Sequence, residues 1–403
     1  MSDDSLQFSS IEEIVEEIRN GRMVIVTDAP GRENEGDLIC AAEFATSDMI
    51  NFMVIHARGL VCVPLSGARA DELKLPLMTS VNRENMSTAF AVSVDAAAKH
   101  GITTGISAFE RSKTIQLLAD PQASTDDFIQ PGHVFPLRAV KGGTLCRAGH
   151  TEATIDLLKL AGLQLAGVCC EIMNDDGTMA RIGDMGPFQR EHGLKACTTA
   201  QLIEYRRRAE KLVKLVESIQ LPTDYGLFTC HVYKSLVDDA CHLALVNGEI
   251  SHEKPILVRV HSECLTGDVF GSRRCDCGSQ LHQAMTRIGE EGGILLYLRQ
   301  EGRGIGLEAK LHAYKLQEQG MDTVEANVAL GFAPDLRDYG IGAQILQDLG
   351  AEHLRLMTNN PKKIIGLEGF GMDVVEQLPL RIDPNDTNRF YLETKRSKMD
   401  HLL

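Results

Sequence analysis

Several features that would place this chain in a membrane, secreted or nucleic-acid-binding class are missing from its 403 residues. It contains no apolar run long enough to span a bilayer. Its first residues, Met-Ser-Asp-Asp-Ser, lack the basic region and apolar core of a signal peptide. The net charge of −15 disfavours general binding to nucleic acid, which normally requires a basic surface. We therefore expect a cytoplasmic protein that contacts neither a membrane nor nucleic acid.

The composition is that of a globular protein with more than one core. The apolar fraction of 43% and the charged fraction of 24% are typical of soluble domains. A chain of this length suggests two domains. The eleven cysteines are odd in number and scattered, which argues against a disulfide framework and for a reducing compartment.

Three of the cysteines lie close together, and a fourth is missing. Ten residues separate Cys264 from Cys275, and one separates Cys275 from Cys277. Three thiolates at this spacing suit one tetrahedral Zn²⁺ ion, with Zn–S distances of about 2.3 Å. A structural zinc site has four protein ligands, whereas a catalytic site keeps a position for water, which can ionise near neutral pH and attack an electrophilic carbon.

Two other interpretations of these cysteines remain open. They could be small buried hydrophobic residues, although charged neighbours such as Arg273, Arg274 and Asp276 are uncommon in a hydrophobic core. Alternatively, His261 could supply a fourth ligand and close the site. The second interpretation would make the zinc structural rather than catalytic.

The first half of the chain places charged residues after predicted secondary structure. Residues 11–20 predict an amphipathic helix, with a capping box between Ser10 and Glu13. A short buried strand from Met23 to Thr27 then leads into the charged loop 28–37. Taken alone, such a loop is more often a solvated turn than a site.

Three further segments supply histidines and carboxylates. His133 lies in a predicted loop bounded by Pro131 and Gly132. His150 precedes a predicted helix that Thr151 could cap, and Glu171 ends a predicted strand. Each histidine alone is more often structural, but together these groups suit a divalent cation and a phosphorylated sugar.

Residues 1–205 resemble 3,4-dihydroxy-2-butanone-4-phosphate synthase. The matching strings are Arg-Glu-Asn-Glu-Gly-Asp, Pro-Gly-His-Val-Phe-Pro-Leu-Arg, Gly-His-Thr-Glu-Ala-Thr-Ile-Asp and Asn-Asp-Asp-Gly-Thr-Met-Ala-Arg. That family converts D-ribulose 5-phosphate to 3,4-dihydroxy-2-butanone 4-phosphate and formate with Mg²⁺ or Mn²⁺. The resemblance implies that Glu33 and His150 hold the metal, and that His133 and Glu171 serve the proton transfers. The substrate contacts that it implies are Arg32, Glu33, Asp37, Arg147, Ala148, Gly149, His150 and Thr151.

One segment departs from that family's pattern. The family usually carries several acidic residues immediately before the Arg-Glu pair, whereas here only Asp28 remains, followed by Ala29-Pro30-Gly31. We expect activity because Glu33 is present, although loop closure or rate could differ.

The second half begins with a charged segment and continues with strands that end in polar residues. Residues 200–220 predict a helix with its arginines on a solvated face, ended by the break at Leu221–Gly226. A strand over 256–260 precedes the cysteine loop, and Ser279 could cap the helix that follows. The strand 293–298 leads to a Gly-rich turn over 299–306, which would let backbone amides approach phosphate groups. The last strand, 353–357, precedes Lys362 and Lys363, which could also meet a phosphate.

Residues 206–403 resemble GTP cyclohydrolase II. The matching strings are Arg-Val-His-Ser-Glu-Cys-Leu-Thr-Gly-Asp, Arg-Cys-Asp-Cys-Gly, Arg-Gln-Glu-Gly-Arg-Gly-Ile-Gly-Leu, Asp-Thr-Val-Glu-Ala-Asn and Met-Thr-Asn-Asn-Pro-Lys-Lys. That family hydrolyses GTP to 2,5-diamino-6-(ribosylamino)pyrimidinone 5'-phosphate, formate and pyrophosphate. The resemblance implies zinc on Cys264, Cys275 and Cys277, Asp335 as proton acceptor and Arg337 as nucleophile at the α-phosphate. The GTP contacts that it implies are Arg259, Val260, His261, Ser262, Glu263, Gln280, Glu301, Gly302, Arg303, Thr323, Thr358 and Lys363.

Together these observations predict an α+β protein of two consecutive mixed α/β-layer domains, 1–205 and 206–403, joined by a short helical linker. The two resemblances imply a bifunctional enzyme of riboflavin biosynthesis, and we expect it to form a homodimer. Two alternatives remain at this stage. The altered loop could leave only the GTP cyclohydrolase half active, or the fold could serve a zinc-bearing RNA-binding regulator.

Overall fold

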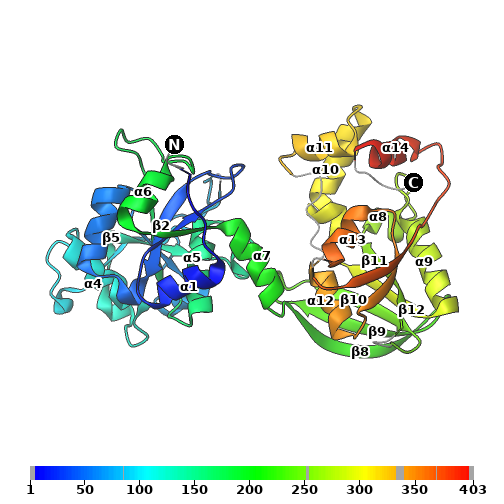
Figure 1. Cartoon of the computed structure of the whole chain (residues 1–403), viewed down its shortest axis with the longest axis horizontal. Helices are drawn as coiled ribbons and strands as arrows, with labels where there is room; N and C mark the ends of the chain where they lie inside the picture. The colour runs from blue at the N-terminus through cyan, green and yellow to red at the C-terminus, as the bar shows by residue number, and fades with distance from the viewer. Residues whose placement is uncertain (1–4, 85, 251–253, 333–339, 369, 399–403) are drawn as a thin grey trace. The chain divides into compact units, whose positions relative to one another are not determined.

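The computed structural model describes residues 5–84, 86–250, 254–332, 340–368 and 370–398 (Figure 1). The chain divides into two compact units, Met1–Ala209 and Glu210–Leu403. Each unit consists of a sheet covered by helices, so the predicted fold class is confirmed. Among the described residues, no helix is both long and apolar enough to cross a membrane.

The first unit is built on a seven-stranded sheet in the order β4-β5-β3-β6-β2-β1-β7. Its strands are β1 Val24–Thr27, β2 Gly36–Ala41, β3 Cys62–Leu65, β4 Val94–Ala96, β5 Phe128–Arg138, β6 Gly167–Glu171 and β7 Lys195–Thr198. Its α-helices are α1 Ile11–Arg19, α2 Ser47–Phe52, α3 Gly67–Glu72, α4 Ala108–Ala119, α5 His150–Ala161, α6 Met185–His192 and α7 Thr199–Ala209. The pairs β1/β7 and β3/β5 are parallel, and the other neighbouring strands run antiparallel.

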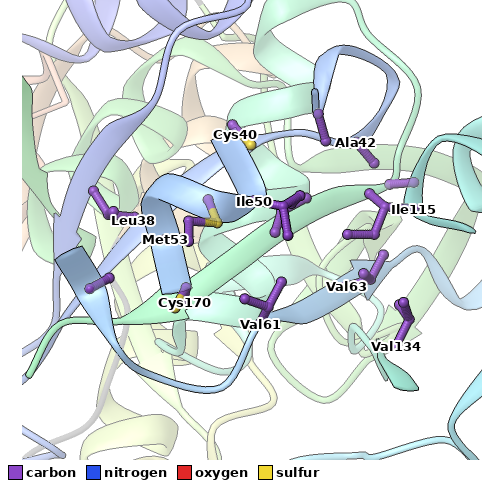
Figure 2. Close-up of a cluster of buried hydrophobic side chains, with 14 of the residues drawn as sticks. Leu38, Cys40, Ala42, Ile50, Met53, Val61, Val63, Ile115, Val134 and Cys170 are labelled. Carbon is purple, nitrogen blue, oxygen red and sulfur yellow. The ribbon is translucent and has the colours of Figure 1, made fainter. Parts of the chain in front are cut away.

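Alternating side chains of this sheet pack into two separate cores. Val24 and Val26 of β1 join the core formed with α1 and α5, whereas Ile25 between them joins the core on the opposite face. This alternation follows from the two-residue period of a strand. Figure 2 shows part of the core that contains Ile25, where side chains of α2 and α4 pack against those of the sheet. The unit is therefore a three-layer arrangement of helices, sheet and helices.

The predicted first helix is confirmed. It runs over Ile11–Arg19, and the capping box between Ser10 and Glu13 is present. Its buried residues lie on one face, as the periodicity predicted.

Two local predictions in the first unit are wrong. The predicted loop around His133 is part of strand β5. Thr151 does not cap α5, because the helix begins one residue earlier, at His150, with Gly149 at the N-cap and no side-chain cap.

The second unit has another seven-stranded sheet, in the order β14-β13-β11-β12-β10-β9-β8. Its strands are β8 Val213–Thr223, β9 Gly226–Ser235, β10 Cys241–Asn247, β11 Ile256–Ser262, β12 Gly293–Leu298, β13 His353–Met357 and β14 Asp373–Leu378. Its α-helices are α8 Leu265–Asp268, α9 Cys277–Glu291, α10 Gly306–Glu318, α11 Thr323–Ala329, α12 Gly340–Asp348, α13 Pro361–Glu368 and α14 Arg389–Lys398. Strands β8, β9, β10 and β12 pair antiparallel, and β12, β11, β13 and β14 pair parallel.

The parallel half of this sheet brings the predicted nucleotide-binding segments to one edge. The cysteine loop follows β11, the Gly-rich turn follows β12 and the Lys363 segment follows β13. Because neighbouring parallel strands end at the same edge, these three loops converge there, which is the usual ligand position in such sheets.

Two predictions in the second unit are also wrong. The helix predicted over 200–220 ends at Ala209, and β8 begins at Val213. Val213 is buried whereas Val216 is exposed, so these two apolar residues do not share one buried face, and the strand has a bulge between Leu215 and Glu217. Ser279 lies inside α9, whose N-cap is Asp276.

Candidate active sites

Asp28 organises the loop between β1 and β2 in the first unit. Its carboxylate accepts hydrogen bonds from the backbone N–H groups of Glu33 at 3.0 Å and Glu35 at 2.9 Å. It also pairs with Arg32 Nη1 at 3.0 Å, and its side chain is completely buried. The acidic residue that this chain retains before the Arg-Glu pair therefore fixes the shape of the loop.

A cluster of two carboxylates and an imidazole lies beside this loop, next to Glu171. Asp37 of β2 pairs directly with Glu171 of β6, so both side chains project from the same face of the sheet. His150, the first residue of α5, places Nδ1 3.5 Å from Asp37 Oδ1 and 3.7 Å from Glu33 Oε2. The structure thus brings together four of the predicted site residues.

The charges of this cluster perturb one another. Burial, with the nearby carboxylates of Glu171 and Glu33, raises the pKa of Asp37 to about 7. Burial disfavours the imidazolium of His150, but Asp37 and Glu33 outweigh it and raise the pKa of that ring to about 9. Competition for protons at a buried cluster of this kind is typical of functional sites.

The donor atoms of this cluster fit a small divalent cation. Within the described part of the chain, Asp37 Oδ1 and His150 Nε2 are buried and have no hydrogen-bond partner. Two ligand atoms bound side by side to Mg²⁺ at about 2.1 Å lie about 3.0 Å apart. The 3.7 Å between Glu33 Oε2 and His150 Nδ1 requires only a small adjustment to reach that geometry.

Two arginines converge at the N-terminus of α5. A Cβ atom added to Gly149 would lie 2.4 Å from Arg147 Nη1 and 3.0 Å from Arg32 Nη2, so both guanidinium groups approach the backbone there closely. Glu152 Oε2 holds Arg147 Nη1 at 2.6 Å. The helix start has no side-chain cap, so its backbone N–H groups and the two guanidinium groups can bind an anion. The other predicted contacts here, Ala148 and Thr151, belong to this same turn.

His133 stands apart from the carboxylate cluster. Its Nδ1 lies 2.7 Å from Asp95 Oδ2, and its side chain is 44% exposed. Strand β3 separates β5, which carries His133, from β6, which carries Glu171. Among the described residues, the side chain of His133 pairs with Asp95, whereas that of Glu171 accepts from the backbone of Leu60.

Glu171 has its own support at the end of β6. Its Oε2 accepts a hydrogen bond from Leu60 N at 2.8 Å. The adjacent Gly59 packs against the same strand, where an added Cβ atom would lie 2.3 Å from Glu171 O. Gly59 is a residue that the sequence did not single out and that this close approach requires.

In the second unit, the three predicted cysteines converge. Cys264 follows β11, Cys277 is the first residue of α9, and Cys275 lies in the loop two residues before it. Their sulfur atoms lie within 4.8 Å of one another, with Cys264 Sγ and Cys275 Sγ 3.7 Å apart. Two thiolates bound to a tetrahedral Zn²⁺ ion at about 2.3 Å are about 3.8 Å apart. The cluster therefore fits zinc closely.

His261 is not a fourth member of the cluster. Its Nε2 lies 3.1 Å from Asp268 Oδ1, and its ring stacks on Tyr297 with the centroids 5.6 Å apart. Its buried Nδ1 has no hydrogen-bond partner among the described residues. Burial lowers the pKa of His261, which favours the neutral ring. Within the described chain, the cysteine group has three protein ligands.

A pocket of about 1070 Å³, open to solvent, lies over the cysteines. Of the residues predicted to contact GTP, its lining includes Arg259, His261, Ser262, Glu263, Gln280, Glu301, Gly302, Arg303, Thr323, Thr358 and Lys363. Val260 does not line it; its carbonyl instead accepts a hydrogen bond from Lys363 Nζ at 2.7 Å. Asp335 and Arg337 lie outside the described residues.

The Gly-rich turn after β12 has an unusual backbone. Gly302 and Arg303 both have positive φ, at 62° and 65°, a conformation that costs energy for a non-glycine residue. Arg303 Nη1 is buried without a hydrogen-bond partner in the part of the chain described. A guanidinium held in this way is poised to bind an anion.

The sequence missed several side chains of this pocket. They include Lys310, Tyr314, Asn327, Asn359, Asn360, Tyr391 and Lys395. Lys310 Nζ lies 3.2 Å from Cys264 Sγ and 2.6 Å from Glu301 Oε1. Asn359 and Asn360 could have been found, because they occupy the same strand-end turn as Thr358. No local signal marked Lys310 or Lys395.

Comparisons with known proteins agree with this geometry. The family model of 3,4-dihydroxy-2-butanone 4-phosphate synthase matches residues 12–205, and that of GTP cyclohydrolase II matches residues 214–379. The chain is 55% identical over 402 residues to the riboflavin biosynthesis protein RibBA of Aquifex aeolicus, covering 99% of each. It is 56% identical over 399 residues to RibBA of Bacillus velezensis, covering 98% of this chain and 99% of the relative.

A solved structure is similar across both units. It is RibBX, a two-domain 3,4-dihydroxy-2-butanone 4-phosphate synthase from A. baumannii, at 39% identity and a TM-score of 0.70. The match covers 93% of this chain and 100% of that one. The chain belongs to the family of bifunctional riboflavin biosynthesis enzymes, with a 3,4-dihydroxy-2-butanone 4-phosphate synthase as its first domain and a GTP cyclohydrolase II as its second.

Proposed function

We propose that each activity depends on its own metal site. In this proposal Glu33 and His150 bind Mg²⁺ or Mn²⁺ in the first unit, and Cys264, Cys275 and Cys277 bind Zn²⁺ in the second. The observation that carries the proposal is the three-sulfur group beneath a pocket of about 1070 Å³, with Cys264 Sγ and Cys275 Sγ at a separation suited to zinc.

In the first site the substrate is D-ribulose 5-phosphate. Its phosphate group binds Arg32, Arg147 and the free backbone N–H groups at the start of α5. The bound cation supplies Lewis-acid polarisation of the sugar carbonyl. Glu171 and His133 move protons; Asp95 holds His133 Nδ1, which leaves Nε2 to exchange a proton.

In the second site the substrate is GTP. Arg303 and Lys363 bind the triphosphate, and the pocket walls formed by Arg259, His261 and Gln280 hold the purine near the cysteines. Bound zinc supplies a water molecule that is acidic enough to ionise near neutral pH. Asp335 as proton acceptor and Arg337 at the α-phosphate remain predictions from the resemblance.

The proposal includes a homodimer in a reducing compartment, the cytoplasm. The eleven cysteines, all of which lie among the described residues, form no disulfide with one another, which supports the compartment. Leu77, Met78 and Val81 are large apolar side chains exposed in one segment of the first unit, which supports burial against a partner. Sedimentation of the intact chain measures the oligomeric state, and a monomer at micromolar concentration would remove the homodimer from the proposal.

The test is a crossed formate assay on the intact chain. Glu33→Gln should lose Mg²⁺-dependent formate release from ribulose 5-phosphate and keep release from GTP, and Cys264→Ser should do the reverse. Glu12→Gln and Cys241→Ser are matched controls, because both residues are exposed and lie outside the two sites.

Each possible outcome separates the alternatives. Formate from GTP alone would mean that only the second half is active. Formate from neither substrate, with RNA retained at moderate salt, would favour an RNA-binding regulator. Loss of both activities in one variant would contradict independent sites.

A further inference from the structure

The C-terminal helix α14 contributes to the GTP pocket although it lies beyond the matched cyclohydrolase region. That region ends at residue 379, and α14 runs over Arg389–Lys398. Tyr391 and Lys395, one helical turn apart, both line the pocket. Helix α14 also packs against α11, which supplies Thr323 and Asn327 to the same pocket (Figure 1).

Lys395 is buried and points at the zinc-ligand loop. Its Nζ lies 2.6 Å from Asp276 Oδ1, and Asp276 stands between Cys275 and Cys277 in the sequence. The lysine side chain is 10% exposed and the aspartate 1%. The ammonium group also lies 4.6 Å from the centroid of the Tyr391 ring, a cation–π distance. Such a buried aspartate needs a positive partner, because an unpaired buried charge is strongly unfavourable.

From Asp276 a chain of hydrogen bonds leads to the proposed nucleotide contacts. Asp276 Oδ2 accepts from Gln280 Nε2 at 2.7 Å, and Gln280 Oε1 accepts from Arg259 Nη2 at 2.7 Å. Arg259 Nη1 in turn donates to Met357 O at 2.9 Å, at the end of β13. Every side chain in this series of hydrogen bonds is buried, so the side chains have few alternative conformations.

We propose that Lys395 is a positioning residue of the cyclohydrolase reaction, acting through Asp276 and Gln280 on Arg259 and on the loop that carries Cys275 and Cys277. Helix α14 is then part of the catalytic apparatus of the second unit rather than a peripheral appendage. The inference rests on the proposed contacts of Arg259 and Gln280 with GTP. Some residues orient metal ligands without binding the metal themselves. Mutating such a residue typically changes metal affinity or activity by about 10- to 100-fold.

The experiment compares Lys395→Met with Lys395→Arg and with the control Arg396→Met in the intact chain. Arg396 is the next residue of α14 and is exposed, so its variant should match the native protein. Lys395→Met should lower kcat/KM for GTP by about 10- to 100-fold, with a raised KM as well as a lowered kcat. Lys395→Arg should recover part of the loss, and the ribulose reaction should stay unchanged in all three.

Two further readouts do not depend on turnover. Lys395→Met should bind GTP more weakly in zinc-free protein measured by calorimetry, and should lose zinc faster to a chelator. A helix that only adds stability would instead reduce the active fraction, so that kcat fell while KM and the affinity of the folded protein for GTP stayed native. That pattern would overturn the proposal.

Two more variants keep the test decisive. If Lys395→Met does not fold, the double variant Asp276→Asn, Lys395→Met removes both charges, and a native KM for GTP in that protein would overturn the inference. Arg259→Met tests the underlying contact. If Arg259→Met leaves GTP affinity unchanged, the proposed nucleotide site fails; if it lowers affinity while Lys395→Met does not, only the role of Lys395 fails.

Discussion

The buried ion pair between Arg206 and Asp156 gives a sharp test of how the first unit is held together. Arg206 belongs to α7, and the sequence predicted it on a solvated face. It is instead 4% exposed, and its Nη1 lies 2.7 Å from Asp156 Oδ2 on α5. Helix α5 begins with His150, so this pair connects the last helix of the unit to the helix that carries a proposed metal ligand. Arg206→Met keeps an unbranched, flexible side chain and removes the guanidinium group with its charge.

The expected loss of folding stability in Arg206→Met follows from the groups that still surround Asp156. Thr144 donates from its N at 2.7 Å and from its Oγ1 at 2.6 Å, but no positive charge stands in for Arg206 among these donors. Removing one partner of a buried ion pair costs about 3–5 kcal/mol. Arg208→Met is the control, because Arg208 pairs with Glu204 on the surface, where such pairs contribute about 0–1 kcal/mol.

The stability that Arg206→Met loses should become smaller as the pH falls. Burial raises the pKa of Asp156, and Arg206 opposes this shift, so removing Arg206 raises the pKa of Asp156 in the folded state further. A carboxyl group whose folded pKa exceeds its unfolded pKa binds protons better when folded. Stability therefore recovers as the pH falls through the folded pKa, and the deficit of the variant is largest near neutral pH.

The assay is heat inactivation of the intact chain, followed separately by formate release from ribulose 5-phosphate and from GTP. The first activity should be lost at a lower temperature in Arg206→Met, while the second serves as an internal reference. Calorimetry near pH 7 and near pH 5 gives the size of the change and its pH dependence. The reasoning is refuted if Arg206→Met and Arg208→Met lose the same stability, or if the deficit grows as the pH falls.

Two other predictions concern the first site. Gly59→Ala should lower ribulose turnover and spare GTP turnover, because the new methyl group would lie 2.3 Å from Glu171 O; native kinetics would show that the end of β6 tolerates displacement. Asp95→Asn should lower kcat for ribulose 5-phosphate by about 100-fold or more with little change in KM, because Asp95 holds His133 Nδ1 at 2.7 Å and general acid–base groups contribute that much. A steady-state profile in which only KM changes would remove His133 from the proton transfers.

Features set by nearby residues could be predicted from the sequence. The first helix is fixed by its capping box and by one apolar face, both of which lie within ten residues. The segments that end in site residues were also visible, because a buried apolar run followed by polar residues marks the end of a strand. The convergence of the three cysteines followed from their spacing and from the chemistry of thiolates.

Strand β5 could not be predicted, because it contains residues that normally interrupt strands. Pro131 and Gly132 occur where the ladder with β4 is irregular, between the pairs at Ile129 and Val134. There the backbone N–H of Gly132 is bonded to Ser93 Oγ and that of His133 to Asp95 Oδ1. Side chains thus replace the missing ladder bonds, and no local pattern indicates this.

The other missed features depend on residues far apart in the sequence. Lys395 and Asp276 are separated by 119 positions, and Arg206 and Asp156 by 50. A lysine or arginine in a charged helix predicts a solvated face, because most such residues are solvated. Only the fold reveals that these two side chains meet buried carboxylates.

X-ray absorption at the zinc edge of the purified protein tests the central claim most directly, which is that a three-thiolate zinc centre with an open position lies beneath the GTP pocket. The account predicts three sulfur neighbours at about 2.3 Å and one oxygen that is exchangeable with solvent. A fourth sulfur or an imidazole nitrogen bound to the metal, retained when GTP is present, would contradict it.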